Sequence, residues 1–256
     1  MRNLKRALSL ALAAIMLIGM MVVSASAASY NNLTDKDEIV NKDAVSMLVS
    51  LGIIEGKPDG SYAPTENVDR AQMAKMLSVI MNKGVDNSAL YQSVNSGLVD
   101  VNTNWAKGHI NYCYTTGIIA GRGTGTFDPS ATVTALEAAK MLLVAVGYDP
   151  AIEGFEGADW AINVSVRADE QGIFEGFTKD LSAPLNRDDA ALLIYNALDV
   201  EMIQSYTTNN YPIVYSDHRT ILSDKYGVIK VEGVVTANEW AILDDDTDTA
   251  LQEGKT

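Results

Sequence analysis

The chain repeats one pattern three times, and this internal repetition restricts its fold more than any other feature of the sequence. A shift of 65 positions superimposes the first two copies without a gap, pairing Asp35 with Asp100, Gly52 with Gly117, Gly60 with Gly125, Tyr62 with Phe127, and Pro64 with Pro129. A shift of 55 then aligns Trp105 of the second copy with Trp160 of the third. The third copy has three residues fewer after its loop, so Ala135 aligns with Arg187. A unit of this kind cannot bury its apolar face alone, so the units must pack on one another.

Each copy is predicted to contain two helices joined by a glycine-containing loop. In repeat one, Val45, Leu48 and Val49 form the apolar stripe of the first helix, and Gly52 can end it. The second helices begin at capping residues followed three positions later by a polar partner, which are Asp69 with Gln72, Thr134 with Glu137, and the shorter variant Asn186 with Asp189. We therefore predict a mainly α fold of three helix-loop-helix repeats packed as a pseudo-threefold helical cluster, with an open solenoid as the alternative.

The segments outside the repeats have a different character. Residues 1–27 combine basic residues, an apolar run and the small residues Ala25-Ser26-Ala27, which together indicate a secretory signal peptide rather than a membrane anchor. Residues 228–235 alternate like a strand, so we expect the start of a β-rich segment there. The predicted domains are a signal peptide at 1–27, repeats at 28–84, 85–148 and 149–200, and at 201–256 a linker and the start of a downstream domain that is truncated here. The repeats are expected to fold without the segment that follows Glu201.

Charge restricts the partners of the exported chain. Removal of the signal peptide takes away three positive charges and changes the formal net charge from −14 to −17. A chain this acidic is a poor ligand for nucleic acid or for anionic lipid. We therefore expect no nucleic-acid partner and, after removal of the signal, no membrane partner.

The sequence predicts no catalytic residue, no cofactor and no metal site. The single cysteine, Cys113, lies where the other repeats carry Leu48 and Ala168, so it is interpreted as a small buried residue. A catalytic thiol served by His109, one turn away, is the less favoured alternative. The acidic run 244–248 lacks the glycine and the terminal glutamate of an EF-hand calcium loop. We therefore interpret it as a solvated turn.

The ordered combination of motifs resembles the S-layer homology domain family. The pattern is Trp-Ala, then Gly-Ile-Ile-x-Gly, then Gly-x-Phe-x-Pro, and finally a helix start similar to Thr-Arg-Ala-Glu, and it covers residues 33–199. The resemblance implies a three-repeat helical cluster that binds secondary cell-wall polysaccharide attached to peptidoglycan, often bearing pyruvyl ketals. It thereby implies a non-catalytic anchor that holds a secreted protein at the cell wall or S-layer surface.

The resemblance also implies where the polymer binds, namely in grooves between neighbouring repeats with the motif arginine as a ligand. The residues expected to bind polysaccharide are Arg70, Arg187, Gln72, Glu137, Asp189, Trp105, Trp160, Gly56, Gly121 and Gly176. Ala135 replaces the arginine in repeat two, and Val40 replaces the tryptophan in repeat one, so the middle site is expected to be the weak one.

The residue types leave alternatives open at these positions. An arginine at a helix start can bind a carboxylate bidentately, or it can be an exposed residue paired with a nearby aspartate. Both arginines are expected to be exposed. The two tryptophans can stack on sugars or anchor packing, and the glycines can admit a sugar or form turns. The competing functions are the anchoring region of an extracellular polysaccharide-degrading enzyme, and a lattice protein that self-assembles through downstream domains.

Overall fold

The computed structural model describes residues 29–207, 210–214 and 218–229. The predicted signal peptide, the acidic run 244–248 and most of the strand predicted at 228–235 lie outside these residues. Val228 and Ile229, at the start of that stretch, are described and are not in a strand.

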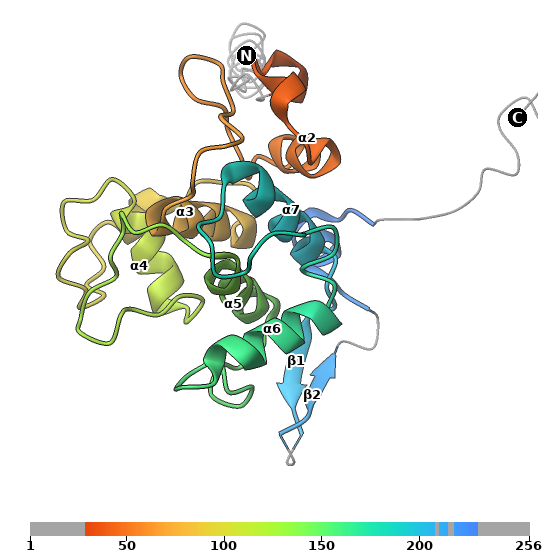
Figure 1. Cartoon of the computed structure of the whole chain (residues 1–256). Helices are drawn as coiled ribbons and strands as arrows, with labels where there is room; N and C mark the ends of the chain where they lie inside the picture. The colour runs from red at the N-terminus through yellow and green to blue at the C-terminus, as the bar shows by residue number, and fades with distance from the viewer. Residues whose placement is uncertain (1–28, 208–209, 215–217, 230–256) are drawn as a thin grey trace, which may run out of the picture.

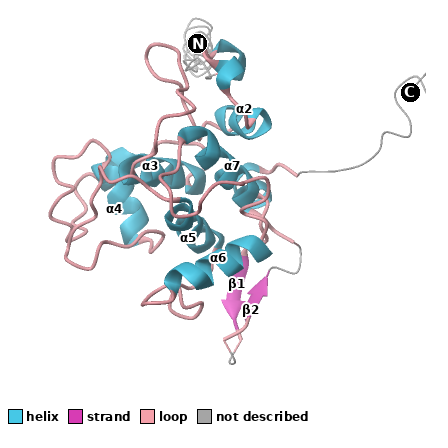
Figure 2. Cartoon of the chain, in the orientation of Figure 1, coloured by secondary structure: helices cyan, strands magenta, loops and turns pink. Residues whose placement is uncertain are grey.

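The predicted helix pairs are present in all three repeats (Figures 1 and 2). Their bounds are α2 (Lys42–Ser50) with α3 (Arg70–Met81), α4 (Lys107–Thr115) with α5 (Ala135–Val146), and α6 (Trp160–Glu170) with α7 (Arg187–Leu198). Short 3-10 helices precede α2 and α4, at Tyr30–Asn32, Lys36–Glu38 and Ser88–Tyr91. The fold is therefore mainly α, as predicted.

A closed ring of backbone hydrogen bonds joins the three repeats just before their second helices. The Val68 N–H donates to the Leu185 carbonyl at 2.8 Å, Leu185 donates to Val133 at 2.8 Å, and Val133 donates back to Val68 at 2.9 Å. In the same cyclic order α4 packs on α3, α6 on α5, and α2 on α7. Figure 1 shows α3, α5 and α7 at the centre with α2, α4 and α6 around them. The ring closes on itself, so the cluster is pseudo-threefold and not an open solenoid.

The second helices begin where the capping residues predict. Asp69 accepts from the Gln72 N–H and Gln72 Oε1 accepts from the Asp69 N–H, and Thr134 with Glu137 forms the same reciprocal box. In repeat three only half of this arrangement is formed. Asn186 accepts from the Asp189 N–H, and the shorter Asp189 side chain pairs with Lys179. Each such cap contributes about 1 kcal/mol to helix stability.

One apolar core runs through all three repeats. Cys113 is fully buried within it, and burial raises the pKa of its thiol well above the ordinary range. The Cys113 thiol points to the Ala74 carbonyl, at 3.4 Å, whereas His109 hydrogen-bonds Ser78. This geometry confirms the interpretation of Cys113 as a small core residue.

The segment that follows repeat three packs back onto the repeats. It forms a two-stranded antiparallel sheet, β1 (Ile203–Tyr206) with β2 (Pro212–Val214), and then α8 (Ile221–Tyr226), which packs on α3 and α7. Ile203, Ile221 and Leu222 are buried in the common core, and the Tyr226 hydroxyl donates to the Ile80 carbonyl at 3.3 Å. Among the described helices, none has the length and apolarity needed to cross a bilayer.

A buried polar pair between α3 and α4 makes stability depend on pH. The Ser78 hydroxyl lies 2.6 Å from His109 Nδ1, and both residues are only 4% exposed. Burial lowers the pKa of His109 below its ordinary value; the opposing effect of the Asp86 carboxylate is smaller. A lowered folded-state pKa means that the unfolded chain takes up the proton more readily. The contribution of His109 is therefore present above about pH 6.5 and is lost as the pH falls through the lower folded-state pKa.

We expect the melting temperature of the parent protein to fall more steeply between pH 7.5 and pH 5 than that of His109→Gln. Thermal melts at a series of pH values measure this difference, and His218→Ala, which removes the exposed second histidine, provides the control. Equal pH slopes for the parent and His109→Gln would exclude the role of His109.

Candidate functional site: two grooves between repeats

Two grooves on the surface collect residues from all three repeats. Groove 1, with a cavity of about 270 Å³, is defined by Gly56, Gln72 and Lys75 from repeat one, Trp105 from repeat two and Arg187 from repeat three. Groove 2, with a cavity of about 540 Å³, is defined by Gly121, Glu137 and Lys140 from repeat two, Trp160 from repeat three and Arg70 from repeat one. The cyclic packing thus brings together eight of the ten residues proposed from sequence, in two groups.

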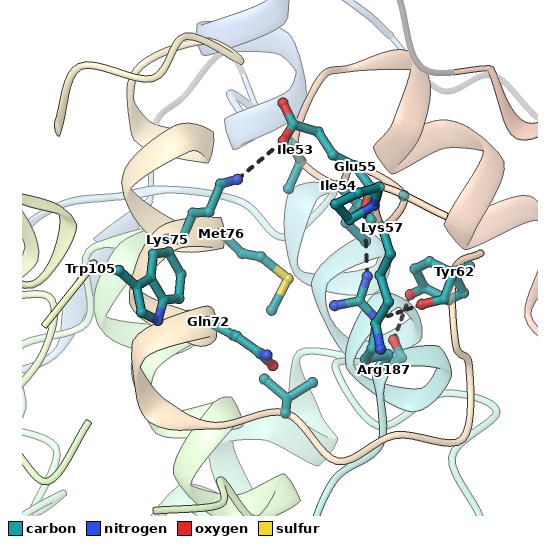
Figure 3. A pocket seen from close by; sticks show the side chains of 13 residues that line it. Ile53, Ile54, Glu55, Lys57, Tyr62, Gln72, Lys75, Met76, Trp105 and Arg187 are labelled. Atoms are coloured by element: carbon teal, nitrogen blue, oxygen red, sulfur yellow. Dashed lines mark hydrogen bonds and ion pairs between the residues drawn. The ribbon is translucent and has the colours of Figure 1, made fainter. Parts of the chain in front are cut away.

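Figure 3 shows how groove 1 is built. Trp105 and Arg187 lie on opposite walls, with Gln72 and Met76 of α3 between them. The amine of Lys75 lies 3.2 Å from a carboxylate oxygen of Glu55, at the rim of the groove. A planar guanidinium, an amine, an amide and an indole therefore surround one small space.

Each groove arginine is clamped by the loop of the next repeat. Arg187 donates through Nε to the Tyr62 carbonyl at 2.7 Å, and its guanidinium carbon lies 4.8 Å from the centre of the Tyr62 ring. Arg70 makes the matching contacts with Phe127. Its Nε donates to the Phe127 carbonyl at 2.8 Å, and its guanidinium carbon lies 4.4 Å from the centre of the Phe127 ring. These two contacts fix the plane of the guanidinium, and the Nη2 of Arg187 also donates to the Glu55 carbonyl, at 3.4 Å.

The expectation that both arginines are exposed is wrong, because Arg70 is only 4% exposed and Arg187 is half-buried. Its Nη2 also donates to the Ala120 carbonyl, at 3.0 Å, so the side chain is built into the loop. Burial lowers the pKa of Arg70 to about 10, and repulsion from Arg122 adds to this effect. Within the described residues, no carboxylate lies within 4.0 Å of the Arg70 or Arg187 guanidinium. The sequence left open that each arginine pairs with a nearby aspartate, and no such pair is present among the described residues.

Two aspartates that the sequence analysis did not assign hold the aromatic residues in place. Asp100 accepts from the Phe127 N–H at 2.9 Å and from the Asp128 N–H at 2.7 Å. Asp35 accepts from the Tyr62 N–H in the same way, at 2.7 Å. The sequence shows that the two aspartates align at a shift of 65. It does not show that each one hydrogen-bonds an aromatic residue 27 positions later.

The two tryptophans differ in exposure. Trp105 is 58% exposed and lies just before α4, so its ring is available to a ligand. Trp160 is half-buried at the first position of α6, and the Lys140 amine lies 5.6 Å from its ring centre. Packing therefore accounts for part of the surface of Trp160, whereas it explains little at Trp105.

The proposed polar residues of the helix starts lie in different surroundings. Gln72 lines groove 1, and Glu137 lines groove 2, where its Oε1 lies 2.6 Å from Arg122 Nη1. Asp189 pairs with Lys179 and belongs to neither groove. The lysines of the grooves, Lys75 and Lys140, were missed from sequence, although the shift of 65 aligns them.

The loops themselves favour glycine at the proposed positions. A Cβ added at Gly121 would lie 2.8 Å from the Thr126 carbonyl oxygen, and one at Gly56 would lie 3.1 Å from the Leu33 side chain. Gly176 has φ of +76°, a conformation that favours glycine. Gly56 and Gly121 nevertheless line the grooves, whereas Gly176 faces Leu192.

The interface between repeats two and three differs from the other two. Ala135, which stands in place of the arginine, is fully buried and faces the loop of repeat three, because the Leu136 N–H donates to the Leu181 carbonyl. The groove without an arginine is therefore the one at repeat three, not the middle one as expected. Leu192 replaces the groove lysine there. Val40, which replaces the tryptophan, is 82% exposed, and its N–H donates to Asp188.

Comparison with known proteins finds a family whose model matches part of the chain. The S-layer homology domain model matches residues 32–74 and 99–139. The chain is 27% identical over 258 residues to the "Cell surface protein" of Thermoanaerobacter kivui, an alignment that covers 100% of this chain and 31% of the relative. It is 32% identical over 113 residues to the "S-layer protein" of Bacillus licheniformis, with coverage of 44% and 12%.

The relatives include an enzyme. The chain is 30% identical over 173 residues to the "Exoglucanase XynX" of Acetivibrio thermocellus, which covers 62% of this chain and 15% of that protein. The chain thus spans less than a third of the length of each of these relatives. S-layer homology domains are non-catalytic and anchor surface proteins to the cell wall. The two matched segments contain the loops of repeats one and two, and this match together with the surface-protein relatives indicates a secreted, cell-wall-associated surface protein.

Proposed function

We propose that the three helix pairs form one S-layer homology anchor, which binds an acidic secondary cell-wall polysaccharide in grooves 1 and 2. The ligand class is a polymer whose sugars carry carboxylates, such as pyruvyl ketals. The observation that carries the proposal is the pair of grooves, each with a clamped arginine that has no carboxylate partner among the described residues.

The chemistry of the grooves fits such a sugar. A guanidinium whose plane is fixed can bind a carboxylate with two parallel hydrogen bonds, and less side-chain entropy is lost on binding. The adjacent amine of Lys75 or Lys140 adds positive charge, and the Trp105 ring offers an apolar face to the ring of the sugar. Local positive charge is needed because the chain as a whole carries a formal charge of −14.

The larger protein that this anchor serves has two candidates. The surface-protein and S-layer relatives favour a component of a surface layer, which self-assembles through downstream domains. The exoglucanase relative and an "Amylopullulanase" of Thermoanaerobacterium thermosulfurigenes, 30% identical over 173 residues, favour the anchoring region of a polysaccharide-degrading enzyme. Both candidates require the same non-catalytic module here.

Wall sedimentation tests the proposal. The full chain should co-sediment with cell walls that carry the acidic polymer and remain in the supernatant with walls stripped of it. Trp105→Ala should weaken sedimentation without changing the melting temperature, because Trp105 is 58% exposed. Val40→Ala, at the corresponding exposed position of the third interface, is the matched control and should sediment like the parent. Equal sedimentation with stripped walls would refute the proposal.

A further inference from the structure

The two grooves carry a different residue at the same structural position. The third residue of the second helix is Gln72 in groove 1 and Glu137 in groove 2. Both side chains accept from the backbone N–H of their N-cap residue, at 3.3 Å and 3.2 Å, so each is held in the same place by the same capping box. The amide and the carboxylate therefore cap the helix in the same way. They differ in charge, and this difference affects the binding of an acidic ligand.

The carboxylate of Glu137 is a fixed negative charge inside groove 2. Its side chain is 17% exposed, one oxygen accepts from the Thr134 N–H and the other bonds Arg122. The charge of Arg122 is thereby neutralised within the protein. Glu156 also lines groove 2, so three cations there face two carboxylates.

Groove 1 has no such charge at this position. The amide nitrogen of Gln72 has no hydrogen-bond partner in the part of the chain that the structure describes, and it remains available as a donor. The lining contains Lys57, Lys75 and Arg187 with Glu55 as its carboxylate, and the side chain of Glu55 is 67% exposed at the rim (Figure 3). The Lys57 amine also pairs with Glu66, which lies outside the lining.

We propose that this capping-box position sets the affinity of each groove for an acidic sugar, so that Gln72 makes groove 1 the stronger anion site and Glu137 weakens groove 2. The proposal rests on the proposed function, because it concerns binding of a carboxylate in the same grooves. The reciprocal exchange Gln72→Glu and Glu137→Gln reverses the order of the two affinities. Either residue completes a capping box, so the exchange changes charge with little change in fold.

The two grooves can be observed separately in the full chain. Trp105 lies in groove 1 and Trp160 in groove 2, so the indole N–H signals of the two rings report each groove in ¹⁵N–¹H spectra. The probe is a monosaccharide glycoside carrying a pyruvyl ketal, and the same glycoside without the ketal is the neutral control. Trp105→Phe and Trp160→Phe assign the signals.

We expect tighter binding at the Trp105 signal than at the Trp160 signal in the parent. Gln72→Glu should weaken binding at Trp105 by about threefold to tenfold, as expected for one added charge at the edge of a solvated site, and Glu137→Gln should strengthen binding at Trp160 by a similar factor. The neutral glycoside should bind the parent and both variants equally.

The outcomes separate the two proposals. If the ketal-bearing sugar shifts neither indole signal in the parent, the proposed function fails. If it binds the parent but neither exchange changes the affinity at its own groove, the grooves bind acidic sugar and the capping-box position does not control the affinity. If Gln72→Glu weakens the ketal-bearing and neutral sugars equally, the effect is steric, which also overturns the inference.

Discussion

A chain that ends at Glu201 is expected to lose most of the stability of the repeats. Ile203, Ile221 and Leu222 are each at least 93% buried in the common core, with exposed fractions of 7%, 2% and 2%. Burial of such a side chain contributes about 1.5–3 kcal/mol, so the three together contribute roughly 5–9 kcal/mol. Whole domains are stable by about 5–15 kcal/mol. The sequence-based expectation that the repeats fold without this segment is therefore replaced by the opposite prediction.

Circular dichroism melts measure this effect, with a chain that ends at Ile229 as the matched control. The control keeps β1, β2 and α8 and should melt cooperatively like the full chain. The chain that ends at Glu201 should melt far lower or without a cooperative transition, because the apolar faces of α3 and α7 that contact α8 become exposed. Coincident melts of the two truncated chains would show that the segment adds nothing to the core.

Arg70→Ala is expected to destabilise the fold by about 3 kcal/mol as well as to abolish binding in groove 2. The guanidinium donates to the carbonyls of Phe127 and Ala120 and stacks on the Phe127 ring. Hydrogen bonds to a charged group contribute about 1.5–3 kcal/mol, a buried cation–π contact contributes about 1–2 kcal/mol, and the carbonyls would lose their partners. Equilibrium denaturation measures the loss.

Arg122→Ala is the control for this prediction, since Arg122 lines the same groove. Its side chain is 39% exposed and pairs with Glu137 at the surface, so its removal should cost less than about 1 kcal/mol. If Arg70→Ala were no more destabilising than Arg122→Ala, Arg70 would serve the ligand alone and the loop would hold its shape without it.

Local features of the sequence determined the helices of this protein. The aligned glycines, the capping pair Asp69 with Gln72 and the apolar stripe around Leu48 act over a few residues, so their consequences follow from spacing alone. Cys113 could be interpreted correctly for the same reason, because its position in the repeat is apolar in the other copies. The pattern also required the repeats to pack together.

Only the tertiary structure decided which residues share a groove. Arg187 reaches the loop of repeat one and Arg70 the loop of repeat two because the ring of hydrogen bonds closes. Ala135 faces the loop of repeat three for the same reason, so the groove at repeat three is the one that lacks an arginine. The spacing of residues within one repeat does not show which other repeat supplies the arginine of its groove. The burial of Arg70 and the packing of Ile221 on the repeats likewise depend on contacts between residues far apart in the chain, which local pattern does not encode.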